Sequence, residues 1–443
     1  MTISHLHSRS TAFVMESGNM SGEQFLADIA RYQARISDIE QNKQALLFDP
    51  DIYQFAVKLF ALSLAGFDVY LPQNGQPQTL KALQPNVGFC AGSTLTIDGL
   101  VNLDTRAGKH QLTADCVQWP ESGRVFFSTS GSTGTPKLIE KHWHHLNCES
   151  DTLIRTFCLG QEEAVLSTVP HFHIYGLLFK LLVPLKTGVP ILPMIEFPEQ
   201  GLAQLQGTNR CTLVSSPAFL KRLATNNSFE TEKSKITHIF SSGGPLSDED
   251  AIQLYRQLNI GITQVYGSTE SGGIAYRQVN SLPASFWQPF NGIEISVNGD
   301  QQLLLRSPYI AEPSMLMDDR VELADDQQFK LCGRVDRTVK LEEKRVNLSE
   351  MEASLTQHDW VSEAKVLVLN GKRQQLAAVV ALTSIGQAEF ESTSRFSFNR
   401  QLNQWLAERF ETIVRPRKWR YVQELPYNAQ GKLVQATMEK LFE

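Results

Sequence analysis

Between residues 163 and 267, short apolar runs alternate with longer segments that have the spacing of amphipathic helices. The runs predict strands at 164–169, 189–193, 212–215, 236–241 and 262–266, and the longer segments predict helices at 176–185, 198–205, 217–225 and 248–258. Strands that alternate with helices in this way form parallel sheets whose faces the helices cover. Ligands of such sheets bind beyond the carboxyl ends of the strands. The sequence therefore predicts an α/β fold with a binding site along one sheet edge.

Three polar segments follow predicted strands and so fall at that edge. Segment 170–176 reads Pro-His-Phe-His-Ile-Tyr-Gly, segment 241–245 reads Ser-Ser-Gly-Gly-Pro, and segment 265–273 reads Val-Tyr-Gly-Ser-Thr-Glu-Ser-Gly-Gly. Each has an ordinary structural interpretation, which is a buried His–Tyr pair, a tight turn and a helix cap, respectively. Ligand binding is the alternative, and their position beyond the strand ends favours it.

The segment 128–137, Ser-Thr-Ser-Gly-Ser-Thr-Gly-Thr-Pro-Lys, follows a further apolar run and combines hydroxyl side chains, two glycines and a lysine. Glycines let the backbone approach a ligand closely, and amides and hydroxyls donate to phosphate oxygens. A Walker-type loop does not fit, since Pro136 replaces its second glycine and Leu138 follows the lysine. A solvated linker is the plainer alternative, but the loop is short and residues 138–141 predict a second strand. We therefore expect a polyphosphate-binding loop within a hairpin.

This segment resembles the phosphate-loop signature of the adenylate-forming superfamily, which contains acyl-CoA synthetases, aryl-CoA ligases, luciferases and the adenylation domains of peptide synthetases. Further motifs of that superfamily follow in the same order, and the resemblance extends over about residues 50–435. It implies ATP as a substrate together with Mg²⁺. It also implies that the phosphates are bound by Ser128, Thr129, Ser130, Gly131, Ser132, Thr133, Gly134 and Lys137.

Segment 265–273 is similar to the Y-G-x-T-E motif of the superfamily. The resemblance implies that Tyr266 stacks near the adenine, that Thr269 bonds the α-phosphate and that Glu270 holds Mg²⁺. A carboxylate suits the last role because Mg²⁺ takes hard oxygen ligands and bridges phosphate oxygens. Thr269 and Glu270 are therefore expected to act in catalysis.

Segment 170–176 resembles the part of aryl-CoA ligases that lines the acyl pocket. His173 aligns with the motif histidine, which implies a hydrogen bond to the carboxylate or a place in the pocket floor, and Tyr175 would line the same pocket. Gly243 and Gly244 would let the backbone lie flat against the acyl group and the adenine edge. These features indicate a flat, aromatic acid as the substrate, and a medium-chain fatty acid is the alternative.

Residues 293–341 change to short alternating runs with turn residues between them, which predicts an antiparallel meander. The superfamily carries a ribose-binding aspartate here in a Thr-Gly-Asp triplet. Asp319 aligns best with it and Asp318 is the alternate, although the threonine and the glycine are absent. A G-R-x-D segment follows, which implies that Arg334 reaches the ribose or the phosphates and that Asp336 is the hinge of the last domain.

The loop after this hinge departs from the superfamily pattern. Arg345 is implied as a further phosphate contact, but Glu343 stands two residues earlier, where the superfamily usually has a glycine. In thioester-forming members that loop lies along the tunnel for pantetheine, and a large carboxylate there would narrow it. The acceptor is therefore expected to be the thiol of CoA or the phosphopantetheine of an acyl carrier protein, which would then be a partner.

Residues 336–443 predict a small, mobile α+β domain that follows a large N-terminal AMP-binding domain at 1–335. Segment 425–433 resembles the terminal L-P-x-x-x-x-G-K motif, which makes Lys432 the adenylation lysine. A lysine suits this step because negative charge concentrates between the attacking carboxylate and the α-phosphate. The resemblance implies that the last domain turns about Asp336, withdraws Lys432 and admits the thiol.

Composition limits the alternatives. The 443 residues are 42% hydrophobic and 20% charged, as in soluble globular proteins, and the net charge of −6 argues against a nucleic-acid binder. The six cysteines are scattered without a C-x-x-C pair, which favours the cytoplasm over a zinc or disulfide framework. No signal peptide is apparent, and Lys180 and Pro184 interrupt the most apolar segment, so no membrane span is expected. His142, His144 and His145 could hold a metal, but ordinary histidines are favoured, since no further ligand with suitable spacing is seen.

Taken together, the motifs predict an AMP-forming acid–thiol ligase that makes an acyl-adenylate and then a thioester. A non-catalytic protein that binds nucleotide and acyl ligand is the alternative from a different class. The missing Thr-Gly-Asp triplet and Glu343 favour that alternative, whereas the presence of Glu270 and Lys432 opposes it. A P-loop ATPase is a third possibility and would release ADP instead of AMP. The oligomeric state does not follow from the sequence.

Overall fold

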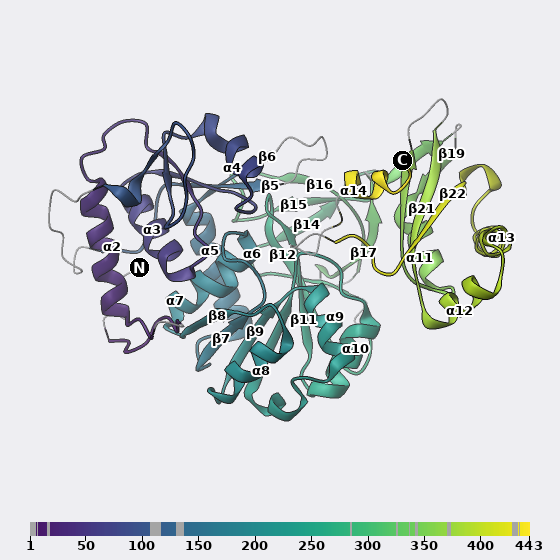
Figure 1. Cartoon of the computed structure of the whole chain (residues 1–443), viewed down its shortest axis with the longest axis horizontal. Coiled ribbons are helices and arrows are strands. Elements are labelled where there is room, and N and C mark those ends of the chain that lie inside the picture. The colour runs from purple at the N-terminus through teal and green to yellow at the C-terminus, as the bar shows by residue number, and fades with distance from the viewer. Residues whose placement is uncertain are drawn as a thin grey trace. The chain divides into compact units, whose positions relative to one another are not determined.

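A computed structural model of the chain describes residues 6, 8–15, 18–106, 117–129, 137–283, 286–324, 327–335, 337–341, 344–369, 374–427, 433 and 435–443 (Figure 1). The chain divides into two compact units, which we treat separately. The first contains Met1–Glu294 and Arg306–Ser314, and the second contains Ile295–Leu305 and Met315–Glu443. In the part of the chain that the structure describes, no helix is both long and apolar enough to cross a membrane.

The first unit begins with a six-stranded sheet of order β4-β3-β1-β2-β5-β6. Its strands are β1 (Gln44–Leu47), β2 (Asp68–Leu71), β3 (Phe89–Ala91), β4 (Val101–Asn102), β5 (Arg124–Thr129) and β6 (Lys137–His142). Helices α2 (Gly22–Ile36) and α3 (Ile52–Leu64) pack on each other through buried rings such as Phe25 and Phe60, whose centroids lie 5.7 Å apart. Only β5 and β6 pair antiparallel in this sheet, with Thr129 opposite Lys137, so the predicted hairpin is present.

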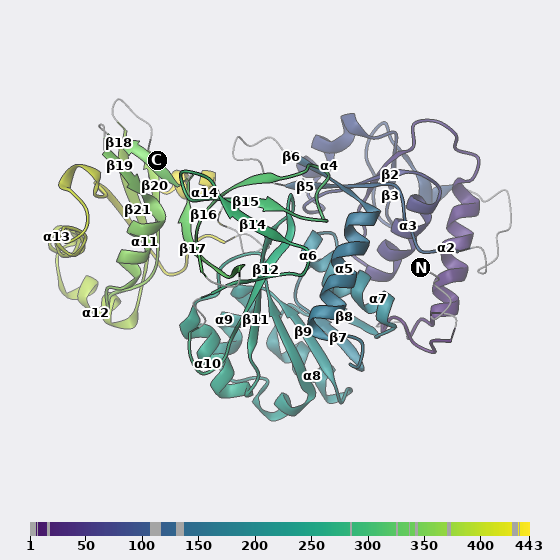
Figure 2. The same cartoon turned by 180° about the vertical axis from the view of Figure 1, so that it is seen from behind.

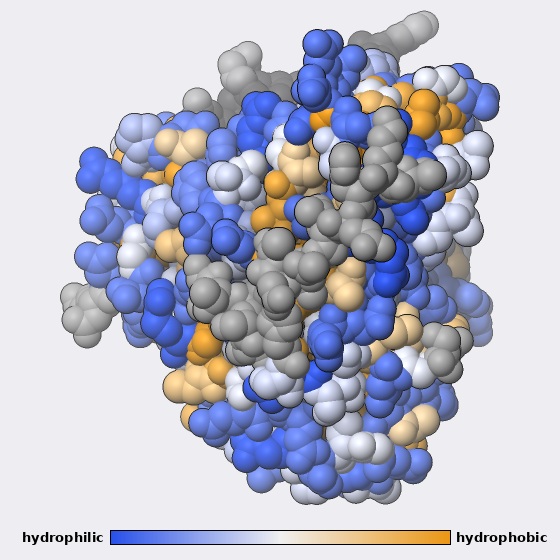
Figure 3. Space-filling model, turned by 90° about the vertical axis from the view of Figure 1, so that its left-hand side faces the viewer, coloured by the Kyte–Doolittle hydropathy of each residue, from blue (hydrophilic) through white to orange (hydrophobic). Residues whose placement is uncertain are grey.

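Shorter helical turns complete this part of the unit, namely α4 (Pro77–Leu83), η1 (Gln84–Asn86) and η2 (Leu103–Thr105). Leu80 and Leu83 of α4 are buried and pack in one cluster with Leu46 of β1 and Cys90 of β3. On the side of the molecule that Figure 3 displays, hydrophilic residues dominate and hydrophobic residues form separate small patches. Large apolar side chains of this unit, such as Phe25, Phe55 and Phe60, are fully buried in its core.

The second sheet of this unit has seven strands in the order β13-β12-β11-β10-β9-β7-β8. They are β7 (Ala164–Ser167), β8 (Ile191–Met194), β9 (Cys211–Ser215), β10 (Ile236–Ser241), β11 (Ile262–Ser268), β12 (Gly272–Val279) and β13 (Gln288–Pro289). The strands from β7 to β11 are parallel, as predicted. Strands β12 and β13 continue the sheet antiparallel, an extension that the sequence did not predict.

Consecutive side chains of a strand point to opposite faces of the sheet, and here each face has its own helices. Ile239 packs in one cluster with side chains of α8 (Pro198–Gln206), α9 (Pro217–Asn226) and α10 (Asp248–Leu258). Phe240 instead meets Phe157 of α5 (Trp143–Phe157) and Phe179, with centroids 4.9 Å apart in both pairs. Helix α5 therefore covers the other face, which Figure 2 displays. The carboxyl ends of the strands remain available for a site.

The helix predicted at 176–185 forms as three joined pieces. They are α6 (Ile174–Gly176), the π-helix η4 (Leu177–Leu182) and α7 (Val183–Thr187). Pro184 lies in the first turn of α7, where its missing amide costs no helical hydrogen bond. A π-helix is rare and occurs mostly at functional sites, and this one directly follows the predicted acyl-pocket segment.

The second unit contains the predicted meander, a four-stranded sheet of β14 (Glu294–Val297), β15 (Gln302–Arg306), β16 (Met315–Leu323) and β17 (Phe329–Arg334). Next come the hairpin of β18 (Thr338–Leu341) and β19 (Lys344–Asn347), and then α11 (Leu348–Thr356). A three-stranded sheet of β20 (Val361–Leu369), β21 (Gln375–Leu382) and β22 (Lys418–Val422) follows. The remaining elements are α12 (Ser384–Ser392), α13 (Arg395–Leu406), η5 (Glu230–Lys235) of the first unit, η7 (Thr412–Val414) and α14 (Gln435–Lys440).

The predicted fold class is confirmed, with helix-covered parallel sheets, an antiparallel meander and a C-terminal α+β part. The core of that last part joins side chains of α11, α13 and the three-stranded sheet, such as Met351, Phe398 and Trp419. The division by contacts groups the meander with the C-terminal residues. The boundary predicted at residues 335 and 336 is the position about which the C-terminal domain would turn. It stays a prediction.

Candidate active site

Two hairpins of the first unit bring a lysine and a carboxylate together. Lys137 begins β6, directly after the predicted phosphate loop, and Glu270 lies in the turn between β11 and β12. The Nζ atom of Lys137 lies 3.2 Å from Oε1 of Glu270, and the glutamate side chain is 34% exposed. Burial acts to raise the pKa of Glu270, but hydrogen bonds from its own amide and from Lys137 outweigh burial and lower that pKa. Glu270 is therefore an accessible, charged carboxylate beside a cation.

The turn that carries Thr269 and Glu270 is closed by two serines. The amide of Ser268 donates to Oγ of Ser271 at 3.0 Å, and the amide of Ser271 donates to Oγ of Ser268 at 3.1 Å. Gly272 follows with φ of +71°, a conformation that suits glycine, and a Cβ there would lie 2.7 Å from Oε2 of Glu149. The turn therefore has a defined conformation and close packing against a carboxylate.

A buried lysine donates hydrogen bonds to the backbone of the same turn and of a second segment. Nζ of Lys141 donates to the carbonyl oxygens of Glu270 at 2.7 Å and Tyr309 at 2.9 Å. Burial lowers the pKa of Lys141, and the charges of nearby Glu149 and Glu270 oppose this effect. Glu149 accepts a hydrogen bond from the amide of Gly273 at 2.6 Å. Burial raises the pKa of Glu149 to about 7, although Lys141 and the Gly273 amide act to lower it.

The residues around Glu270 fit a Mg²⁺ ion that is bound together with ATP. Mg²⁺ in nucleotide sites usually takes one or two carboxylates and completes its shell with phosphate oxygens and water. Glu270 offers an accessible carboxylate, and Lys137 beside it can pair with phosphate. A search of the described residues found no group of three or more His, Cys, Asp or Glu that could hold a metal.

The three neighbouring histidines do come together. The ring centroids of His142, His144 and His145 lie 4.0 to 5.5 Å apart. They are not among any metal-binding group in the described part of the chain. Burial, with the charges of neighbouring groups, lowers the pKa of His145 to about 4.

The two histidines of segment 170–176 differ in environment. His171 is buried, and burial lowers its pKa to about 3, so the neutral ring donates from Nε2 to the carbonyl oxygen of Asp49 at 2.9 Å. His173, the predicted motif residue, is partly exposed at the start of α6. A Cβ at Gly176 would lie 2.0 Å from the carbonyl oxygen of Pro170, which explains the glycine. The segment thus folds back closely on itself at Gly176.

Tyr175 follows β7 and the glycine pair follows β10, two strands of the same sheet with β9 between them. The hydroxyl of Tyr175 donates to the carbonyl oxygen of Ser215 at 3.2 Å, and Ser215 pairs with Ser241 at the ends of β9 and β10. Gly243 and Gly244 come two and three residues after Ser241 and are exposed. The structure therefore places Tyr175 and this glycine turn along the same sheet edge, as predicted.

Three further residues of the predicted nucleotide site have described surroundings. Tyr266, near the end of β11, lies with its ring centroid 5.6 Å from that of Trp287. Ser128 is buried within β5, and Thr129 Oγ1 donates to the carbonyl oxygen of Lys137 at 3.3 Å. The hydrogen bond of Thr129 joins β5 to β6 where the predicted phosphate loop leaves the hairpin.

In the second unit, the predicted ribose-site residues form a cluster. Asp319 of β16 lies opposite Arg334 of β17 in the sheet register. The guanidinium of Arg334 lies 3.6 Å from a carboxylate oxygen of Asp319 and 3.3 Å from one of Asp318. Asp319 has little exposed side chain, whereas Asp318 is mostly exposed. Arg345 lies in β19, opposite Lys340 in the register.

Several predicted site residues lie outside the described residues. They are Ser130, Gly131, Ser132, Thr133, Gly134, Asp336, Glu343 and Lys432. Their roles stay predictions. Some of the described site residues form one group in each unit. In the first unit Lys137 pairs with Glu270, and in the second unit Arg334 pairs with Asp319.

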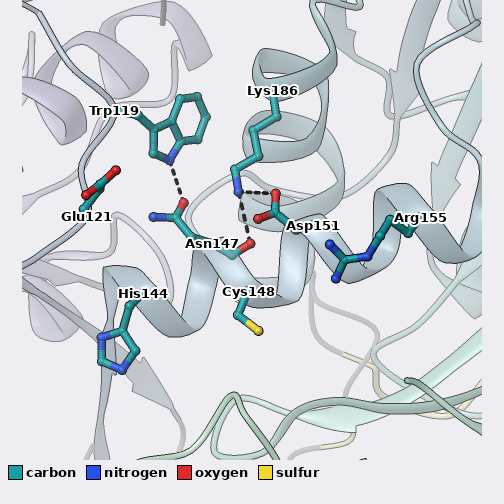
Figure 4. A pocket seen from close by; sticks show the side chains of 8 residues that line it. All are labelled: Trp119, Glu121, His144, Asn147, Cys148, Asp151, Arg155 and Lys186. Atoms are coloured by element: carbon teal, nitrogen blue, oxygen red, sulfur yellow. Dashed lines mark hydrogen bonds and ion pairs between the residues drawn. The ribbon is translucent and has the colours of Figure 1, made fainter. Parts of the chain in front are cut away.

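A pocket of about 490 Å³ opens between α5 and α7 (Figure 4). It is lined by Trp119, Glu121, His144, Asn147, Cys148, Asp151, Arg155 and Lys186. Lys186 is satisfied there, with Nζ 2.7 Å from Oδ1 of Asp151 and 3.0 Å from the carbonyl oxygen of Asn147. None of the predicted site residues lines this pocket, so it is separate from the predicted nucleotide site.

Three buried charged residues were missed by the sequence analysis as parts of the site. Ile139 and Lys141 are two positions apart in β6 and both are buried. A lysine at a position where the alternation of the strand predicts a buried side chain was the signal that could have identified Lys141. Lys180 interrupts an apolar run, and it is buried in η4 with no ion pair or hydrogen bond of its ammonium group among the described residues. Burial lowers the pKa of Lys180 to about 7. Glu149 gave no local signal, since helices often carry glutamate.

The fold is that of an α/β protein, and its predicted site residues lie at or after strand ends. Residues 60–304 match the family model described as AMP-binding enzyme, and residues 350–432 match the AMP-binding enzyme C-terminal domain. The chain belongs to the AMP-binding enzyme family.

Relatives and solved structures agree with this membership. A 4-coumarate–CoA ligase of Halorhodospira halophila is 26% identical over 73% of this chain and 78% of its own length. A 3,4-dihydroxybenzoate–[aryl-carrier protein] ligase of Bacillus anthracis is 23% identical over 70% of this chain and 72% of its own length. The O-succinylbenzoate coenzyme A synthetase of Bacillus subtilis, solved with ATP and magnesium, has 16% identity and a TM-score of 0.79 over 99% of this chain and 98% of that chain. The predicted family, fold class and enzyme class, an AMP-forming acid–thiol ligase, are confirmed by these matches.

Proposed function

We propose that this AMP-binding enzyme activates an aromatic carboxylic acid with ATP and transfers the acyl group to a thiol. The observation that carries the proposal is the pair of Lys137 and Glu270, in which a phosphate-loop lysine and a predicted Mg²⁺ ligand meet from two different sheets. The two residues are 133 positions apart in the chain. Their contact is what a site for a magnesium-bound polyphosphate requires.

The proposed reaction has two steps. A carboxylate oxygen of the acid attacks the α-phosphorus of ATP, the bond to the bridging oxygen breaks, and pyrophosphate leaves. The thiol sulfur then attacks the acyl carbon of the adenylate, loses its proton, and AMP leaves. When bound, Mg²⁺ neutralises phosphate charge. The chain itself orients the phosphates through Lys137 and Thr269, and Lys432 would stabilise the charge that develops in the first step.

The acyl side of the proposal concerns an aromatic substrate. Tyr175 packs edge-on against Phe179, with centroids 5.1 Å apart, and Phe179 packs against Phe240 in β10. Aromatic side chains at the strand ends suit a flat ring, since rings pack well in offset or edge-on geometry. The relatives named above for 4-coumarate and 3,4-dihydroxybenzoate act on aromatic acids. A medium-chain fatty acid is the alternative.

The acceptor is proposed to be either CoA or a carrier-protein phosphopantetheine, since both kinds of ligase occur among the relatives. A substitution of Glu343 would show which of the two acceptors the enzyme uses. If its carboxylate obstructs the pantetheine tunnel, Glu343→Gly should raise turnover with free CoA and leave carrier-protein turnover the same. Unchanged or lower turnover with CoA would contradict this role. Rates of thioester formation with both acceptors provide the measurement.

The proposed location is the cytoplasm. The five cysteines that the structure describes, Cys90, Cys148, Cys158, Cys211 and Cys332, are free thiols. Free thiols suit a reducing compartment.

The experiment that tests the proposal is a panel of aromatic and aliphatic acids with MgATP, scored for AMP with CoA and with carrier proteins. The proposal predicts AMP and a thioester with at least one aromatic acid. Preferential activity with aliphatic acids would identify the fatty-acid alternative. ADP as the product would contradict an adenylating enzyme. Nucleotide binding without AMP formation for any acid would identify a non-catalytic binder.

A further inference from the structure

We propose that Lys141 is a positioning residue that holds the turn with Thr269 and Glu270 in the orientation needed for MgATP. The inference rests on the proposed function. Lys141 is only 2% exposed and comes from β6, the strand that directly follows the predicted phosphate loop. Its ammonium donates to the carbonyl oxygen of Glu270 itself, at 2.7 Å. It therefore fixes the backbone of the residue whose side chain is the predicted Mg²⁺ ligand.

The second contact of Lys141 ties the turn to another segment. The same ammonium donates to the carbonyl oxygen of Tyr309 at 2.9 Å, and Tyr309 is itself buried. Lysine carries three donors on one atom, so it can join two carbonyl groups from distant parts of the chain. An apolar side chain at this place would leave both buried carbonyls without that donor, which is costly in a low-dielectric interior.

Glu149 holds the other end of the same turn. Its carboxylate is fully buried and accepts from the amide of Gly273 at 2.6 Å, three residues after Glu270. The charges of Lys141 and Glu149 stabilise each other in the interior. One buried cation thus binds the carbonyl at the start of the turn, and one buried anion binds the amide at its end.

The arrangement connects the two halves of the predicted nucleotide site. Lys137 and Lys141 belong to one strand, and they hold the side chain and the backbone of Glu270, respectively. A shift of β6 would therefore move the phosphate-loop lysine and the metal-binding turn together. Groups that orient a metal ligand from behind typically change metal affinity or activity by about 10–100-fold when they are mutated.

A matched control separates positioning from general stability. Lys186 is also a buried lysine of the first unit, with a carboxylate and a backbone carbonyl as partners, and it lies at the separate pocket between α5 and α7 (Figure 4). Lys186→Met should lower the unfolding temperature about as much as Lys141→Met does. Only the latter variant should alter the use of Mg²⁺.

The test compares wild type, Lys141→Met, Lys141→Arg and Lys186→Met in three measurements. These are calorimetric titration with MgATP and with ATP in EDTA, the Mg²⁺ concentration for half-maximal pyrophosphate exchange, and thermal unfolding. For Lys141→Met we expect an increase of about 10–100-fold in the half-maximal Mg²⁺ concentration. Calorimetry should show weaker MgATP binding and unchanged binding of ATP in EDTA. Lys141→Arg should recover part of both effects.

Equal Mg²⁺ requirements for Lys141→Met and Lys186→Met would overturn the proposal. So would a loss of ATP binding that is the same with and without Mg²⁺. If Lys141→Met does not fold, Glu149→Gln keeps the volume and removes the charge at the other end of the turn, and it should raise the Mg²⁺ requirement in the same direction. Failure of the proposed function is a different result: wild type would then show no acid-dependent exchange, while calorimetry would still compare the variants.

Discussion

The turn between β11 and β12 and the helical segment at 174–187 lie beside the same sheet but are stabilised in opposite ways. Polar contacts hold the turn, through the Ser268–Ser271 pair and through Lys141 and Glu149. Apolar burial holds most of the helical segment. Lys186 at its end pairs with Asp151, whereas the ammonium group of Lys180 has no ion pair or hydrogen bond among the residues described. The comparison teaches that the turn with Thr269 and Glu270 is held in one conformation by polar contacts of the protein itself. The predicted acyl side is shaped by packing and carries one charge that packing does not satisfy.

The largest effect is expected on the polar side, from Glu270→Gln. The amide keeps the shape of the side chain and one oxygen, but it loses the negative charge that pairs with Lys137 and that attracts Mg²⁺. We expect acid-dependent pyrophosphate exchange to fall about a hundredfold or more, which is the order lost when one preorganised group at a transition state is removed. The unfolding temperature should change little, since the side chain is 34% exposed. A fall of less than tenfold would show that the turn does not carry the metal site.

An intermediate effect is expected on the apolar side, from Lys180→Met, and it depends on pH. The pKa of Lys180 is about 7 in the folded chain, against about 10.4 in an unfolded chain. Between these values the unfolded state binds more protons, so the free energy of unfolding of wild type rises with pH, by at most about 1.4 kcal/mol per pH unit. Methionine removes this slope, and the variant should be the more stable protein near pH 7.

Urea unfolding of wild type and Lys180→Met at pH 7, 8 and 9 measures this difference. The gap between the two proteins should shrink as pH rises, because the free energy needed to deprotonate Lys180 on folding falls as pH approaches the pKa of lysine in the unfolded chain, about 10.4. Equal slopes would mean that Lys180 keeps an ordinary pKa through a partner. The two regions of the first unit would then be alike in satisfying their buried charges.

The smallest effect is expected from Tyr175→Phe. The ring stays packed against Phe179, and only the hydrogen bond from the hydroxyl to the carbonyl oxygen of Ser215 is lost. Such a bond contributes about 0.5–1.5 kcal/mol to stability. We expect a small fall in unfolding temperature, a change of less than about threefold in KM for the acid and no change in KM for ATP. A large loss of kcat would instead place the hydroxyl in contact with the substrate.

The sequence predicts features formed by consecutive residues better than contacts between residues far apart in the chain. The hairpin of β5 and β6 and the alternation from β7 to β11 follow from periodicity, because each element is written in consecutive residues. The contact of Lys137 with Glu270 follows from motif order at strand ends. The π-helix at Leu177–Leu182 does not follow, since apolar spacing is nearly the same for both kinds of helix.

The support of the turn could not be predicted for a related reason. Lys141 and Glu149 meet the turn only through the pairing of elements more than a hundred residues apart. Neither residue belongs to a motif, and a lysine in a strand is usually read as solvent-facing. The alternation with Ile139 predicts that Lys141 is buried, but the sequence does not show which elements of the fold its ammonium group meets.

The measurement that tests the central claim most directly is exchange of labelled pyrophosphate into ATP, with wild type and Glu270→Gln, for each acid of the panel. The account predicts exchange that requires an acid, occurs with at least one aromatic acid and falls about a hundredfold in the variant. MgATP binding by wild type without exchange for any acid would contradict it.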